Sequence, residues 1–170
     1  LKKRDAEINL FQQDVRRKVV THYAVNQKLE DLPNGLVLLN MVVDVERVGD
    51  YTKNILDFSL YYPDTIRSED FSENLAEIEK EVALRFTKTI QAINSQDAEV
   101  AQSLMSSYKD VVSASDEIVK GCISGEIVQG NESKTASLAL YARYLKRIAA
   151  HLKNISSILV NPFEAVGYKK

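Results

Sequence analysis

The stretch VERVGDYTKNI, residues 45–55, is echoed one hundred residues later by LKRIAAHLKNI, residues 145–155. Four residue types recur at matching positions of the two stretches, and two apolar positions match as well. The matched pairs are Arg47/Arg147, Lys53/Lys153, Asn54/Asn154, Ile55/Ile155, Val45/Leu145 and Val48/Ile148. Because self-similarity at a fixed offset indicates a repeated structural unit, the chain is predicted to contain two copies of one helical unit.

Apolar residues recur at steps of three and four along most of the 170-residue chain, which is the spacing of amphipathic helices. The sequence contains no run of alternating apolar and polar residues bounded by turns, so no strand is predicted. We therefore expect five helices, at about residues 1–26, 35–61, 68–94, 97–124 and 133–160. LPNG, at residues 32–35, is expected to be a turn before the second helix. SED, at residues 68–70, is expected to cap the third helix.

Short connections between these helices predict antiparallel neighbours in an all-α bundle. The repeat assigns the last three helices to a second unit, residues 65–170, and leaves two helices for a first unit, residues 1–64. We therefore expect a helix ahead of Leu1 to complete the first unit. Without it, apolar faces of the first two helices would be exposed or covered by a partner chain. The tail VNPFEAVGYKK is expected to leave the last helix at Pro162, with Phe163 packing back as an anchor.

The composition excludes several classes of function. A net charge of −2 argues against non-specific binding to nucleic acid. The sequence contains no run of about 18 apolar residues, so no membrane span is predicted. A single cysteine, Cys122, is expected to be a buried thiol in a reducing, cytoplasmic setting. His22 and His151 are expected to be surface or packing residues. No glycine-rich phosphate loop and no nucleophile–histidine constellation can be assembled, so we expect no enzymatic activity.

Glu46 and Asp50 form the strongest candidate binding site. Residues four apart lie on one helix face, and two like charges there weaken an isolated helix unless something neutralises them. Two carboxylates in this arrangement can bind a cation. Alternatively, Glu46 forms an ion pair with Lys53 or Arg47, and Asp50 accepts a hydrogen bond from a tyrosine or lysine across the bundle. In the second copy the matching positions are Lys146 and Ala150, which are expected not to bind metal.

The repeated motif resembles that of the PhoU family. VERVGDYTKNI is close to the family pattern, EINLFQQDVRRKVV at residues 7–20 resembles the helix before it, and RYLKRIAAHLKNI at residues 143–155 resembles the second family motif. The resemblance covers nearly the whole chain. It implies an all-α fold of two tandem three-helix-bundle repeats, similar to spectrin repeats, with the first helix of repeat 1 missing from the chain.

The resemblance also implies a function. Members of this family are non-catalytic cytoplasmic regulators that restrain phosphate import and phosphate-starvation signalling by docking to a phosphate-transporter ATPase and a sensor histidine kinase. A homodimer is one assembly that is compatible with this role. Some members bind multinuclear metal clusters through Glu-x-x-x-Asp pairs, and Glu46 and Asp50 match this motif as a candidate site for iron, zinc or manganese. Two alternatives are a metal-binding protein with a storage or enzymatic role and a regulatory domain of a sodium–phosphate cotransporter.

Overall fold

The computed structural model of the chain describes residues 2–26, 29–61 and 72–168. These residues form helices and no strand, as the apolar spacing predicts. The helices are α1 (Lys2–Asn26), α2 (Leu32–Tyr61), α3 (Ser72–Ser95), α4 (Ala98–Ser106), α5 (Tyr108–Ser124) and α6 (Glu132–Ser157), with short 3₁₀ turns η1 (Leu29–Asp31) and η2 (Phe163–Ala165).

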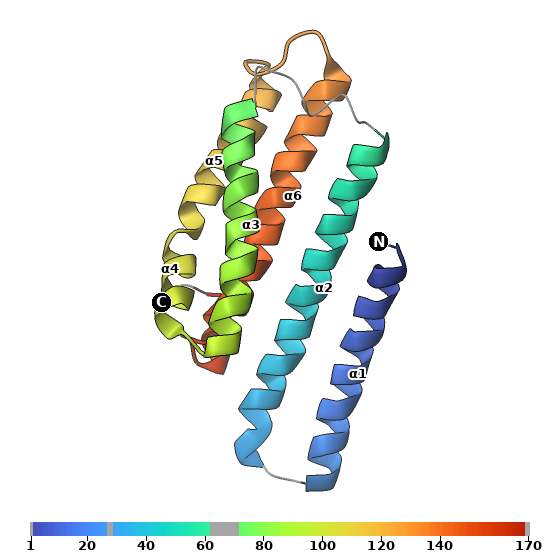
Figure 1. Cartoon of the computed structure of the whole chain (residues 1–170), viewed down its shortest axis with the longest axis vertical. Helices are drawn as coiled ribbons and strands as arrows, with labels where there is room; N and C mark the ends of the chain where they lie inside the picture. Colours follow the sequence, from blue (N-terminus) through green and yellow to red (C-terminus); the bar gives the residue numbers. More distant parts are fainter. Residues whose placement is uncertain (1, 27–28, 62–71, 169–170) are drawn as a thin grey trace.

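The helices lie side by side along one long axis (Figure 1). Helix α6 packs against α2, α3, α4 and α5, whereas α1 packs on α2 alone among the long helices. The buried core lies around α6 and includes a stripe of this helix at steps of three and four, residues Leu138, Tyr141, Leu145, Ile148 and Leu152. A regular stripe of large apolar residues makes α6 the central helix because every neighbour can bury its own apolar face against it.

The predicted fourth helix is broken into α4 and α5 at Ser107. Arg85 of α3 is 2% exposed and donates from its two terminal nitrogens to the Leu104 carbonyl and the Ser107 hydroxyl, each at 2.7 Å. The last carbonyls of a helix lack partners within the helix, so the guanidinium satisfies the end of α4. The prediction of one continuous helix over residues 97–124 is therefore wrong.

The prediction that LPNG is a turn is also wrong, because α2 already begins at Leu32. Proline is tolerated in the first turn of a helix, where its missing amide hydrogen has no partner to lose. A Cβ atom added at Gly35 would lie 2.5 Å from the ring of Tyr23, so this glycine lets α1 and α2 approach closely. Other boundaries shift slightly: α6 ends at Ser157 instead of Val160. The SED segment lies outside the described residues.

The tail folds back on the end of α6. The Asn161 amide donates to the carbonyls of Ala165 and Tyr168, both at 2.8 Å, and the Gly167 amide donates to the Ser157 hydroxyl at 2.8 Å. Phe163 is half-buried in η2, which packs against α2. The tail therefore leaves α6 after Ser157, earlier than the predicted Pro162, and polar contacts around Asn161 hold it in addition to Phe163.

Candidate functional site

The two copies of the repeated motif lie on α2 and α6, which run antiparallel beside each other (Figure 1). Tyr51 and His151 occupy equivalent positions in the two copies, and their rings stack with centroids 5.8 Å apart. Equivalent residues meet each other close to a two-fold axis. The contact is consistent with an approximate two-fold axis between α2 and α6 that relates the two copies of the motif.

The candidate metal pair lies on α2, close to the side that faces α1. Arg47 reaches both carboxylates, with its Nε 3.7 Å from Glu46 Oε2 and one terminal nitrogen 3.5 Å from Asp50 Oδ2. The two acids are partly exposed, so each of these ion pairs contributes little by itself. Their shared cation nevertheless offsets the repulsion between two like charges one helical turn apart.

Lys53 provides a second cation at the same place. Its ammonium lies 3.1 Å from Asp5 of α1 and 3.6 Å from Asp50 of α2. The hydrogen bond from Lys53 to Asp5 raises the pKa of the lysine, and burial opposes the rise. Lys53 thus bridges carboxylates of two helices. Its ammonium occupies the position between Asp5 and Asp50 that a bridging metal ion would need.

These contacts test how well the residues present fit a metal. Within residues 2–26, 29–61 and 72–168, no three or more His, Cys, Asp or Glu side chains are grouped closely enough to hold an ion. Arg47 and Lys53 already neutralise the pair. The described residues therefore do not fit a multinuclear cluster, and the arrangement has the geometry of the salt-bridged alternative. Metal ligation by Glu46 and Asp50 stays a prediction.

The matching face of the second copy carries no acid pair. Lys146 binds Asp116 of α5, with its ammonium 2.6 and 2.7 Å from the two carboxylate oxygens. Ala150, at the position of Asp50, offers no ligand atom. At this position the second repeat thus uses an inter-helix ion pair where the first repeat has Glu46.

A polar cluster joins α2 and α6 at their interface, and no local sequence pattern predicts it as a cluster. Asp44 accepts from the Asn154 amide at 3.1 Å, and its same oxygen lies 2.7 Å from His151 Nδ1. His151 is 8% exposed, and its Nε2 atom has no hydrogen-bond partner among the described residues. Arg147 extends the cluster by donating to the Tyr51 hydroxyl at 3.2 Å.

This cluster tests the predictions for the lone polar residues. His151 is a packing residue, as expected, and Asn154 joins α6 to α2 through its hydrogen bond to Asp44. His22 is partly exposed and contacts Asn26 on its own helix. Cys122 is buried, as predicted, and burial raises the pKa of its thiol.

Comparison with known protein families gives one result. A family model described as the PhoU domain matches residues 1–58 and 75–159, one segment in each predicted repeat. A search of curated proteins finds no match.

Proposed function

Because the chain belongs to the PhoU family, a helical family associated with the regulation of phosphate transport, we propose that it is a non-catalytic regulator of phosphate uptake and phosphate-starvation signalling. It would act by docking a helical surface on a phosphate-transporter ATPase, on a sensor histidine kinase, or on both. The match of the family model to both repeats is the observation that supports this proposal.

The chemistry of the described residues supports a docking role over a catalytic one. The only His–carboxylate pair that is deeply buried among them, His151 with Asp44, has the outline of a general base and its orienting acid. A nucleophile would have to lie within hydrogen-bond reach of His151 Nε2, yet that atom is buried and has no partner in the described chain. The pair joins α2 to α6 across their interface.

No helix in the described part of the chain is long and apolar enough to cross a membrane. Exposed apolar side chains do occur on α1, with Leu10 and Phe11 both more than half exposed. Side chains of this kind suit contact with another protein surface.

Deleting the gene is expected to derepress phosphate uptake or the phosphate-starvation response in cells grown with ample phosphate. The measurement is phosphate uptake and a starvation-responsive reporter in deletion and complemented strains, in rich and poor phosphate. The purified protein should show no turnover of phosphate esters. An unchanged phosphate response in a clean deletion strain would contradict the proposed function.

We further propose that a cation, if bound, is held weakly and singly by Glu46 and Asp50, because it must displace Arg47 and Lys53. Excess iron, zinc or manganese is then expected to stabilise the protein by about 1 kcal/mol, or a few degrees in melting temperature. Replacing Glu46 and Asp50 together by alanine should abolish this shift. The measurement is thermal melting with and without each metal.

Asp14→Ala is the matched control for the metal experiment. Asp14 is also an ion-paired helical carboxylate, 2.9 Å from Lys18, but it lies on the exposed side of α1. This variant should keep the metal-induced shift. A shift that persists in the Glu46→Ala/Asp50→Ala variant would place the site elsewhere, and no shift in the wild type would leave the pair with a salt-bridging role alone.

A further inference from the structure

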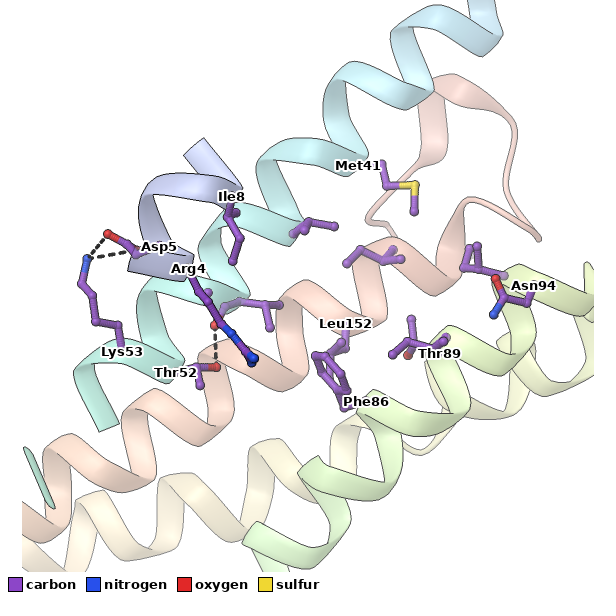
Figure 2. A pocket seen from close by; sticks show the side chains of 16 residues that line it. Arg4, Asp5, Ile8, Met41, Thr52, Lys53, Phe86, Thr89, Asn94 and Leu152 are labelled. Atoms are coloured by element: carbon purple, nitrogen blue, oxygen red, sulfur yellow. Dashed lines mark hydrogen bonds and ion pairs between the residues drawn. The ribbon is translucent and has the colours of Figure 1, made fainter. Parts of the chain in front are cut away.

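Two grooves run along α3, and they differ in charge. The larger one, of about 690 Å³, separates the α1–α2 pair from α3 and α6, and side chains such as Met41 and Phe86 make its lining mainly apolar (Figure 2). Asp5 is the only acid among the described residues that line it, and Figure 2 shows this carboxylate bonded to Lys53. The acidic charge in this groove is therefore neutralised within the chain.

The second groove, of about 510 Å³, lies between α3 and α5, and acids dominate its rim. Helix α3 contributes Glu77 and Glu81, and α5 contributes Asp110 and Glu117. No Lys, Arg or His belongs to the described residues that line this groove. The whole chain has 24 acidic and 22 basic residues, so four acids without a base are a local concentration that the composition does not explain.

The carboxylates lie toward two ends of the groove, because α3 and α5 run antiparallel (Figure 1). At one end, the Nε atom of Arg85 lies 2.9 Å from Glu81, and the charge of Asp110 also favours the charged guanidinium. Glu77 lies one turn earlier on α3 and Glu117 two turns later on α5, so these two lie toward the other end. Neither forms an ion pair with another described residue. This end therefore concentrates negative charge where a cation from outside the chain would be stabilised.

The floor of the groove is apolar. On α5 it is formed by Val111, Ala114 and Ile118, which follow one another at steps of three and four and so lie on one helix face. Val111 and Ile118 are buried, whereas Ala114 and Ile127 are half-buried and keep apolar surface open to a ligand. Leu84, which is 45% exposed, continues the apolar surface along α3. An apolar strip bordered by acids fits a helix whose apolar face is bordered by basic side chains.

We propose that this groove between α3 and α5 binds a basic amphipathic helix of a partner protein. A lysine or arginine of that helix lies between Glu77 and Glu117, and its apolar residues lie against Ala114 and Ile127. The inference rests on the docking role in the proposed function and adds the chemistry of the partner's surface. A small polycation fits less well, because it would neutralise the carboxylates and leave the apolar strip open to water.

The complex is expected to be sensitive to salt. The step from Val111 to Ile118 spans about 10 Å, so the apolar contact is small and the carboxylates supply much of the attraction. Salt screens charges of this kind, which lie at the surface. The affinity should therefore fall severalfold between about 0.05 M and about 0.5 M salt.

Fluorescence anisotropy with a synthetic peptide tests the proposal. The probe is a labelled peptide of about 15 residues, long enough to form a helix, with leucines at steps of three and four and lysines on both sides of them. A second peptide has the same composition in scrambled order, so it keeps the charge without an apolar face. Both are titrated with the wild-type protein and with two double variants.

The groove variant is Glu77→Gln/Glu117→Gln, and the matched control is Glu7→Gln/Glu99→Gln. All four residues are exposed acids on helices, and neither residue of the control lines the groove. Both variants therefore lose the same charge, and only one loses it in the groove. Because the side chains are exposed and glutamine keeps their size, both variants are expected to fold.

The wild type and the control variant should bind the probe equally, and the groove variant at least about fivefold more weakly. The scrambled peptide should bind the wild type at least about fivefold more weakly than the probe does. Amide hydrogen exchange with the probe bound should show protection at residues 107–118. Equal binding by the groove variant overturns the proposal. Equal binding of the scrambled peptide also overturns it, because general attraction between opposite charges would then explain the binding.

This measurement is separate from the phosphate response of a deletion strain. A derepressed phosphate response in that strain, together with no binding of the probe, overturns the groove proposal and leaves the proposed function in place. Binding of the probe that depends on Glu77 and Glu117, together with an unchanged phosphate response, supports the chemistry of the groove and overturns the proposed function.

Discussion

Replacing Leu145 by alanine is expected to lower the free energy of unfolding by about 3 kcal/mol. Leu145 is 4% exposed and lies in the core that α2, α3, α5 and α6 share. The substitution removes apolar contacts and leaves a cavity that four packed helices cannot close completely. Urea denaturation followed by circular dichroism measures the change, which should appear as a lower midpoint with the same slope.

Leu140→Ala is the control for this substitution. Leu140 lies on the same helix, and the same atoms are removed, but the side chain is 45% exposed. Leucine and alanine differ little in helix propensity, so the expected loss is below about 1 kcal/mol. Equal losses for the two variants would mean that α6 is not the central helix of the bundle.

Replacing Arg85 by alanine is expected to destabilise the protein by about 3 kcal/mol, for a different reason. The substitution leaves the buried Leu104 carbonyl without its donor, and it removes the ion pair with Glu81 at 2.9 Å. Burial lowers the pKa of the Arg85 guanidinium, and Glu81 opposes that shift and helps to keep the charge. Denaturation measures the loss, and amide hydrogen exchange around Ser107 should accelerate, because the contact that holds the α4–α5 break is gone.

Two further variants separate polar contacts from packing at this position. Arg85→Met keeps most of the side-chain volume without the donors, and we still expect it to lose about 2 kcal/mol. Lys88→Ala, on the exposed side of the same helix, should change stability by less than about 0.5 kcal/mol. An Arg85→Met variant as stable as the wild type, with unchanged exchange at Ser107, would show that the guanidinium contacts do not hold the break.

The apolar pattern determined most of the fold. The spacing along residues 133–160 predicts the buried stripe of α6, and the structure buries Leu138, Tyr141, Leu145, Ile148 and Leu152 as expected. The repeat between residues 45–55 and 145–155 predicts two related helices, and α2 and α6 meet through Tyr51 and His151. These features are readable because a periodic apolar face must be buried whatever the neighbouring helix is.

Tertiary contacts decided the rest, because they join residues whose partners no local pattern specifies. At the break, Ser107 accepts a hydrogen bond from Arg85 of another helix, and Gly35 is a close-approach residue only because Tyr23 packs against it. Asp44 and His151 meet across 107 positions of sequence. For the acid pair, the sequence determined that Glu46 and Asp50 share a helix face. Only the packing of α1 on α2 placed Lys53 between Asp50 and Asp5, where its charge stabilises carboxylates of both helices.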